Sequence, residues 1–304
     1  MTDLRIVFMG TPEFAVASLE AIVEAGYNVV AVVTAPDKPQ GRGQKIEMSP
    51  VKVCALKHNL NVLQPTNLKS AEFIETLRSL NANLQIVVAF RMLPEVVWSM
   101  PKLGTFNLHA SLLPQYRGAA PIHWAVINGE KETGVTTFFL KHEIDTGSII
   151  YQDREPIAED DTVGSLYDRL MAKGASLVLR TVKAIEAESA PALPQQASGT
   201  LKHAPKLFRE NCEIKWDRPA GDIRNFIRGL NPFPTAWTLL RGKSYKILRA
   251  TVASGGNGEP GTIDTDERTY LRLRASDGWV SIEELQPEGK RKMNVPDFFR
   301  GNKL

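Results

Sequence analysis

The stretch LRIVFMGTPEFAVASLEAIVEAGYNVVAVV, residues 4–33, decides the fold of this chain. Residues 4–9 are apolar except for Arg5 and predict a buried strand, and the turn at 10–12 places a proline where it suits the first turn of a helix. We expect that helix to run to about Ala25 and the next strand to cover residues 28–33. Such a β-α-β unit implies a parallel sheet with a right-handed crossover. Its glycines do not follow the G-x-G-x-x-G spacing, which disfavours a nicotinamide cofactor.

The following segments extend this unit into a Rossmann-like domain with a mostly parallel sheet. We expect helices at 49–59, 70–80, 121–128 and 162–188, and strands at 84–90, 104–108, 133–140 and 148–152. The run SAPALPQQASG, residues 189–199, has the composition of a linker. We therefore expect one domain over residues 1–188 and a linker over residues 189–206.

The last third of the chain has a different pattern, with turn signals at short spacing. Strands are expected at 236–240, 245–252, 269–273 and 280–285, with one short helix at 222–230. This pattern is typical of a small β-barrel, which we expect over residues 207–304.

Composition limits the classes of protein that need to be considered. The 304 residues are enough for two domains, and 43% hydrophobic residues indicate a globular chain. No apolar run approaches the roughly 18 residues of a membrane span, and the start of the chain lacks a signal-peptide layout. Cys54 and Cys212 form no metal or redox motif, so we expect a cytoplasmic protein with reduced thiols.

Charge is unevenly distributed along the chain. Residues 201–304 contain 19 Lys and Arg against 13 Asp and Glu, whereas the whole chain has a net charge of only +3. A basic C-terminal third is a mild indication of a polyanionic partner. Ordinary solvated charge explains the same count about as well.

A second stretch, FNLHASLLPQYRG at residues 106–118, contains the candidate chemistry. Asn107 and His109 lie two residues apart at the end of an expected strand, so both side chains share one face. A neutral imidazole can accept a proton, and a carboxamide can donate to a developing oxyanion. Taken singly, a strand histidine is more often a core residue and a strand-end asparagine a local cap.

The pattern Asn-x-His-x-Ser-Leu-Leu-Pro-x-Tyr-Arg-Gly, with Asp145 in HEIDTG about thirty residues later, resembles the formyltransferases that use 10-formyltetrahydrofolate. The resemblance implies that Asn107 donates to the oxyanion, that His109 donates to it or carries protons, and that Asp145 pairs with His109 or orders a water. It also implies folate contacts from Ser111, Leu112, Leu113 and Pro114, and from Phe90, Arg91, Met92 and Leu93 at the end of the strand at 84–90.

Some features around this pattern stay open or speak against other chemistry. Many relatives carry glycine in place of Arg91, whose side chain either lines the pocket or folds out into solvent. His123 and His142 fit no metal-ligand spacing with His109, so we expect no metal.

A polar loop is expected over residues 34–48, where two prolines and two glycines disfavour regular structure. Taken alone, it would be a mobile surface loop. However, its PDKPQGRG run followed by PVK resembles the segment that family members acting on methionyl-initiator tRNA place against the acceptor end. The resemblance implies that Arg42, Lys45 and Lys38 contact phosphate or bases. Similarly, residues 227–237 resemble the family's C-terminal domain, an oligonucleotide-binding-like β-barrel.

These resemblances imply transfer of a formyl group from 10-formyltetrahydrofolate to the amino group of methionyl-initiator tRNA by a monomeric enzyme. Three alternatives remain: an amino-sugar nucleotide or glycinamide ribonucleotide as acceptor, simple hydrolysis of the folate donor, and an RNA-binding protein with an inactive catalytic fold. The C-terminal barrel argues against the glycinamide enzymes, and the presence of Asn107, His109 and Asp145 argues against the inactive fold.

Overall fold

The computed structural model describes residues 3–40, 45–196 and 199–304. Contacts divide the chain into two compact units, each assembled from separate segments. The first unit comprises residues 1–117, 134–155 and 168–202, and the second comprises residues 118–133, 156–167 and 203–304.

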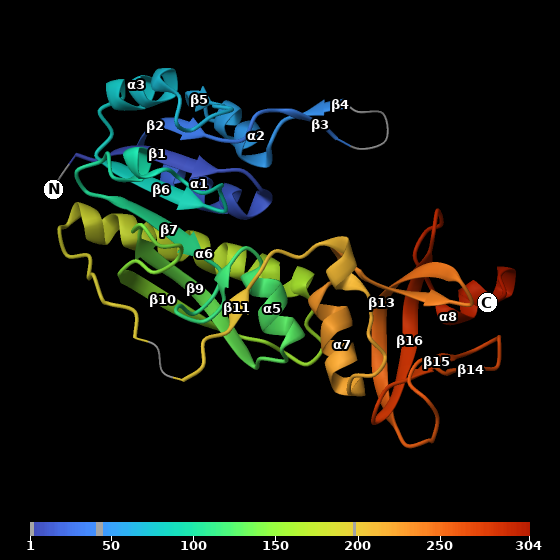
Figure 1. The fold of residues 1–304 in the computed structure, drawn as a ribbon. Helices are drawn as coiled ribbons and strands as arrows, with labels where there is room; N and C mark the ends of the chain where they lie inside the picture. Colours follow the sequence, from blue (N-terminus) through green and yellow to red (C-terminus); the bar gives the residue numbers. More distant parts are fainter. Residues whose placement is uncertain (1–2, 41–44, 197–198) are drawn as a thin grey trace. The chain divides into compact units, whose positions relative to one another are not determined.

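A seven-stranded sheet organises the first unit, with the strand order β10-β9-β7-β6-β1-β2-β5 (Figure 1). The pairs β1–β2, β1–β6, β6–β7 and β2–β5 are parallel, and β7–β9 is antiparallel. The predicted, mostly parallel sheet is thus confirmed. The strands are β1 (Arg5–Gly10), β2 (Asn28–Val33), β5 (Val62–Leu63), β6 (Leu84–Val88), β7 (Thr105–His109), β9 (Glu132–Phe139) and β10 (Ile149–Pro156).

The helices begin where the sequence supplies an N-cap or a proline. Ser49 and Ser70 accept hydrogen bonds from the backbone N–H groups of Lys52 and Phe73, which caps α2 and α3. Proline precedes or opens several of the other helices. The helices up to residue 186 are α1 (Glu13–Glu24), α2 (Pro50–Lys57), α3 (Ala71–Ser79), α4 (Glu95–Trp98), α5 (Pro121–Ile127) and α6 (Val163–Glu186).

The centre of the sheet is apolar on both faces, as parallel strands require. Val7 and Met9 of β1 pack in one cluster with Phe73 and Leu77 of α3. Helix α1 contacts β1, β2 and β6. At the end of β1, a Cβ on Gly10 would lie 2.6 Å from the Cβ of Ala15, so glycine permits the close approach of strand and helix.

The expectation of no regular structure at residues 34–48 is wrong in part. Strands β3 (Lys38–Gln40) and β4 (Lys45–Glu47) form an antiparallel hairpin, with Lys38 opposite Glu47 and Pro39 opposite Ile46. A two-stranded ribbon consists only of edge strands, and an edge strand accommodates a proline that a central strand would reject.

The predicted linker is also tied to the first unit. Leu193 exchanges two backbone hydrogen bonds with Ile149, the first residue of β10, at 2.7 and 2.9 Å. Further along, the Tyr116 N–H donates to the Lys202 carbonyl at 2.7 Å. Two short strands, β8 (Arg117–Gly118) and β11 (His203–Ala204), pair with each other.

The second unit is built on a curled antiparallel sheet with the order β12-β13-β16-β15-β14, and β17 pairs with β16. Its core includes Ile223 and Ile227 of α7 and Phe298 of α8. The predicted C-terminal barrel class is confirmed as a curled half-barrel. The elements are η1 (Arg209–Cys212), α7 (Ala220–Gly229), β12 (Ala236–Leu240), β13 (Lys243–Ser254), β14 (Ile263–Thr265), β15 (Leu271–Arg274), β16 (Gly278–Pro287), β17 (Met293–Asn294) and α8 (Val295–Gly301).

Among the described residues, no helix combines the length and the apolar character needed to span a membrane.

Candidate active site

The candidate site lies at the carboxyl ends of β6 and β7, two neighbouring parallel strands of the first unit. Open α/β sheets place their ligands at this edge. Asn107 lies opposite Val87 of β6, and His109 lies opposite Thr136 of β9. Asn107 is half-buried and His109 is buried. In the part of the chain that the structure describes, we find no hydrogen bond of the Asn107 carboxamide, which leaves its N–H groups available to a ligand.

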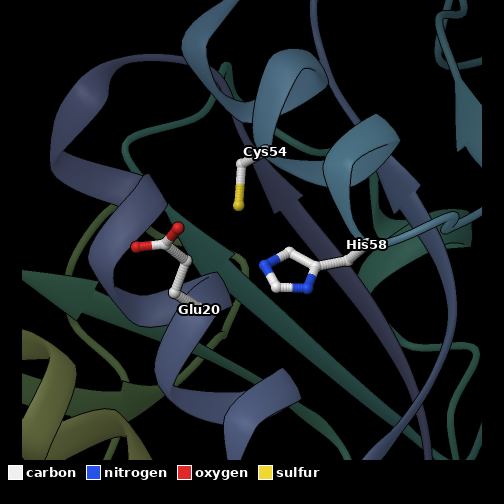
Figure 2. Close-up of side chains that lie close together, drawn as sticks. All are labelled: Glu20, Cys54 and His58. Atoms are coloured by element: carbon white, nitrogen blue, oxygen red, sulfur yellow. The ribbon is translucent and has the colours of Figure 1, made fainter.

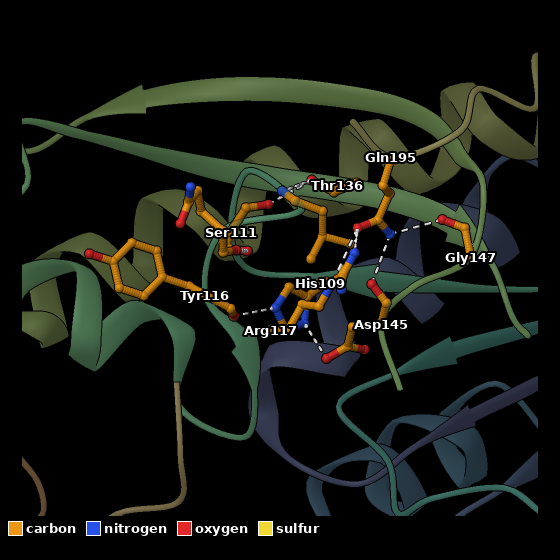
Figure 3. A network of polar contacts seen from close by, with 10 residues as sticks. His109, Ser111, Tyr116, Arg117, Thr136, Asp145, Gly147 and Gln195 are labelled. Atoms are coloured by element: carbon orange, nitrogen blue, oxygen red, sulfur yellow. Dashed lines mark hydrogen bonds and ion pairs between the residues drawn. The ribbon is translucent and has the colours of Figure 1, made fainter. Parts of the chain in front are cut away.

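The surroundings of His109 define which of its nitrogens is basic. Its Nε2 lies 2.8 Å from the backbone carbonyl of Tyr116 (Figure 3). A carbonyl can only accept, so Nε2 holds the hydrogen and Nδ1 is the basic nitrogen of the neutral ring. Nδ1 lies 3.9 Å from Oδ2 of Asp145, and both side chains are largely buried, with 7% and 13% of their surfaces exposed. A proton arriving at Nδ1 would therefore form an ion pair with Asp145.

Asp145 occupies a tightly constrained loop between β9 and β10. Its backbone has a φ of +55°, a left-handed conformation that Asp tolerates better than most residues. Two residues later, a Cβ on Gly147 would lie 1.5 Å from the carbonyl oxygen of Phe139. The glycine in the Asp-Thr-Gly sequence is thus required because the loop passes against the end of β9.

The loop that begins at Ser111 is held by polar contacts to its own backbone. The Ser111 hydroxyl, fully buried, donates to the Gln115 carbonyl at 2.6 Å. Thr136 of β9 donates to the Ser111 carbonyl at 2.6 Å and accepts from the Leu113 N–H at 3.2 Å. Gln152 of β10 donates to the Leu113 carbonyl and to the Thr136 hydroxyl, both at 2.9 Å. The Ser111 hydroxyl is therefore engaged by the loop itself, and Leu113 is buried.

The segment after β6 presents a mixed surface. Leu93 is buried, Phe90 is half-buried, and Met92 has 74% of its surface exposed. Arg91 is exposed, and its guanidinium donates to the carbonyls of Pro65 and Thr66. The Arg91 side chain is thus anchored to a neighbouring loop, and its Cζ lies 5.5 Å from the centroid of the Phe90 ring.

Of the three residues predicted to meet tRNA, Lys38 lies on β3 and is exposed. Lys45 is the first residue of β4, the strand that pairs with β3, and only its backbone is described by the structure. Arg42 lies outside the described residues.

The two histidines that were considered as metal ligands with His109 have other partners. His123 contacts the Phe233 carbonyl at 3.1 Å, and His142 contacts Glu95 at 2.9 Å. Among described residues, one group of metal-ligating side chains lies together elsewhere: Glu20 of α1 with Cys54 and His58 of α2, whose ligand atoms lie within 4.8 Å of one another (Figure 2).

In that group, Glu20 already pairs with Lys57 at 3.2 Å. Burial raises the pKa of the Cys54 thiol to about 11, and the Glu20 carboxylate adds to the rise. Three candidate ligands are also one fewer than a structural zinc site uses. The group contributes none of the predicted catalytic residues.

Three residues of the site were not predicted: Thr136, Gln152 and Gln195. Gln195 contacts both Arg117 and the Asp145 loop (Figure 3). Their sequence neighbourhoods resemble ordinary strands and a linker, so no local signal identifies them. Only the pairing of β9 with both β7 and β10, and the bridge between Ile149 and Leu193, bring them to the site.

Comparison with known proteins identifies the family. Residues 4–182 match the family model described as formyl transferase, and residues 206–303 match the formyl transferase C-terminal domain. A methionyl-tRNA formyltransferase of Bacteroides fragilis is 54% identical, over 98% of this chain and 95% of its own length.

Two solved structures share the fold at lower identity. WlaRD, a sugar 3N-formyltransferase determined in the presence of dTDP and 5-N-formyl-THF, has a TM-score of 0.68 at 23% identity, covering 96% of this chain and all of its own. HypX from Aquifex aeolicus in complex with tetrahydrofolic acid has a TM-score of 0.65 at 18% identity, covering 99% of this chain and 48% of its own. With both domain models matched in order and more than half of all positions identical to a full-length relative, the chain belongs to the formyl transferase family, among the methionyl-tRNA formyltransferases.

Proposed function

We propose that this chain transfers the formyl group of 10-formyltetrahydrofolate to the free amino group of methionyl-initiator tRNA. The 54% identity to a methionyl-tRNA formyltransferase over nearly the full length of both chains carries the choice of reaction and acceptor. The arrangement of Asn107, His109 and Asp145 supports the chemistry.

In the proposed mechanism, His109 accepts a proton from the attacking amine and passes it to the folate N10. The amine must lose one proton as its nitrogen bonds to the formyl carbon, and the folate N10 must gain one as its bond to that carbon breaks. Nδ1 of His109 is free to accept a proton because Nε2 is committed to the Tyr116 carbonyl. Asp145, 3.9 Å away, would stabilise the imidazolium until the proton moves on to N10.

Asn107 would stabilise the negative charge that develops on the formyl oxygen. As the amine adds, the formyl oxygen becomes an oxyanion, which a preorganised N–H donor stabilises in a site shielded from water. Asn107 lies two residues before His109 on the same strand face. Donor and base therefore approach one reacting carbon from one side.

The folate would lie against the two loops that follow β6 and β7. We propose contacts from Phe90, Met92 and Leu93 after β6, and from Leu112 and Pro114 after β7. The Ser111 hydroxyl and the Arg91 guanidinium bond to carbonyls of the chain, so Ser111 and Arg91 would contact the same substrate through backbone groups. The N–H and the carbonyl of Leu113 bond to Thr136 and Gln152, so Leu113 would shape the folate site through its side chain. No metal enters this mechanism.

The acceptor tRNA would contact the segment at residues 34–48 through Lys38, Lys45 and Arg42. We propose residues 1–188 as the catalytic domain, 189–206 as the connecting segment and 207–304 as a tRNA-binding domain, in a monomer. The family models end and begin at residues 182 and 206, which supports this division. Because the acceptor belongs to translation initiation, we propose that the enzyme acts in the cytoplasm.

The test of the reaction is formyl transfer itself. Purified protein is mixed with 10-formyltetrahydrofolate and initiator methionyl-tRNA, and formyl-methionine is measured after mild hydrolysis. Rapid formylation supports the proposal. Loss of the donor's formyl group without formyl-methionine would indicate hydrolysis, and formylation of an amino-sugar nucleotide in preference to the tRNA would change the acceptor.

The test of the tRNA contact is salt dependence. Arg42→Ala should raise the KM for methionyl-tRNA and lower the slope of log KM against log salt by about 1, as expected for one lost phosphate contact. Lys183→Ala on α6 removes the same charge from an exposed helix position and serves as the matched control. An Arg42→Ala enzyme with the slope of the control would remove this residue from the interface.

A further inference from the structure

Gln195 joins two functional segments that are far apart in the sequence (Figure 3). Its Nε2 donates to the backbone carbonyls of Asp145 and Gly147, both at 2.8 Å. Its Oε1 accepts from Nε and Nη2 of Arg117, at 3.2 and 2.5 Å. The Gln195 carboxamide thus donates two hydrogen bonds and accepts two. The positions of its nitrogen and oxygen are unambiguous, because Arg117 can only donate and a carbonyl can only accept.

The two carbonyls belong to residues on either side of Thr146, in the loop that presents the Asp145 carboxylate. Asp145 itself holds a left-handed backbone conformation, which persists only where surrounding contacts enforce it. Gly147 secures the loop on the side of Phe139 by close contact. Gln195, which follows α6 in the chain, secures the same loop by two hydrogen bonds.

Arg117 extends this connection to the loop at 111–118. The residue before it, Tyr116, offers the carbonyl that accepts from Nε2 of His109. A continuous series of polar contacts thus runs from the His109 ring through the Tyr116–Arg117 backbone, the Arg117 guanidinium and the Gln195 carboxamide to the Asp145 backbone. The charged guanidinium polarises the carboxamide, which strengthens its bonds to the two carbonyls.

We propose that Gln195 is a positioning residue for formyl transfer, which holds the Asp145 carboxylate at its working distance from His109. This inference rests on the proposed catalytic role of Asp145. It assigns to residues 193–195 of the expected linker a part in the active site.

The experiment compares Gln195→Ala and the isosteric Gln195→Glu with Gln196→Ala, a substitution of the exposed neighbouring glutamine. Gln195→Glu keeps an oxygen for Arg117 but turns a second oxygen toward two carbonyls. Both Gln195 variants should lower kcat at least about tenfold, since small displacements of catalytic groups are costly. The KM values for folate and methionyl-tRNA should stay within about twofold, and Gln196→Ala should match wild type.

A double substitution separates positioning of Asp145 from a general structural role. In an Asp145→Asn background, Gln195→Ala should reduce kcat little further, because the charge that it positions is already gone. Full multiplication of the two losses, or a wild-type kcat for Gln195→Glu, would overturn the inference. If Asp145→Asn alone retains the wild-type rate, the catalytic assignment of Asp145 fails instead; a slow Asp145→Asn with a fast Gln195→Ala refutes only the positioning role.

Discussion

Replacing Asp145 with Asn tests the pairing on which the proposed mechanism depends. The substitution keeps the size and planarity of the side chain and removes its charge. In the structure, Oδ2 of Asp145 and Nδ1 of His109 are 3.9 Å apart, and both side chains are largely shielded from water. The neutral form of the His109 ring gains little from this charge, whereas the protonated form gains an ion pair. The substitution should therefore act on the transition state.

The expected size of the effect follows from the distance. At an effective dielectric constant of about 20, unit charges about 4 Å apart attract by about 4 kcal/mol. Proton transfer that is half complete in the transition state would place about half of that energy, about 2 kcal/mol, on the barrier. Since about 1.4 kcal/mol corresponds to a tenfold change in rate, about 2 kcal/mol lowers kcat by about 30-fold. Complete proton transfer would place the full attraction of about 4 kcal/mol on the barrier and sets the upper limit at about 1000-fold.

The assay is single-turnover formyl transfer with saturating 10-formyltetrahydrofolate and methionyl-tRNA, so that product release does not mask the chemical step. Asp153→Asn, which removes a carboxylate paired with Arg180 on α6 in the same unit, is the control and should stay within about twofold of wild type. An Asp145→Asn rate within threefold of wild type would refute the electrostatic role. A loss confined to the KM for methionyl-tRNA would place Asp145 in binding instead.

Three further expectations concern the same unit. Asn107→Ala should lower single-turnover kcat by about 10²- to 10³-fold at unchanged tRNA KM, as for a lost oxyanion donor; a change in KM alone would contradict this. Gly147→Ala should lower kcat more than about tenfold, because its Cβ would lie 1.5 Å from the Phe139 oxygen and the Asp145 loop must move; full turnover would show that the loop position is unimportant. Burial raises the pKa of Cys54 to about 11, so its alkylation by iodoacetamide at pH 8 should be at least about 100-fold slower than in the urea-unfolded chain. The alkylation rate, monitored by peptide mass spectrometry, should rise with pH up to about 11. A rate that reaches a plateau below about pH 9 would contradict the raised pKa.

The sequence contained enough information to predict the parallel sheet and the ends of its central strands. Predominantly apolar runs such as residues 4–9 and 84–90 are typical of strands in a sheet covered on both faces, and the turn at 10–12 marks the crossover. Period two then placed Asn107 and His109 on one face without knowledge of any neighbour. The pairing of residues 38–40 with residues 45–47 escaped prediction because proline argues against strands in general, but not against a two-stranded ribbon.

The supporting contacts could not be predicted in this way, because the partners are distant in sequence and chemically ordinary. Arg117 and Gln195 are 78 positions apart, and Gln195 and Asp145 are 50 apart. A glutamine beside prolines predicts a solvated connector, and nothing in its immediate neighbours distinguishes Gln195 from Gln196. The difference between them arises only when β10 pairs with Leu193 and directs one of the two side chains toward the loop.

The difference between the predictable catalytic residues and the unpredictable supporting residues has a physical reason. The segments that present Asp145 and the Ser111 loop leave the strand ladder, so their backbone polar groups lack partners from secondary structure. Side chains supply those partners: Thr136 and Gln152 for the Ser111 loop, and Gln195 for the Asp145 loop. A motif records the side chains that the chemistry selects directly, whereas a backbone carbonyl can be satisfied by any suitably placed amide or hydroxyl. The catalytic groups can therefore be predicted from the sequence, whereas the residues that hold them in position can be identified only from the fold.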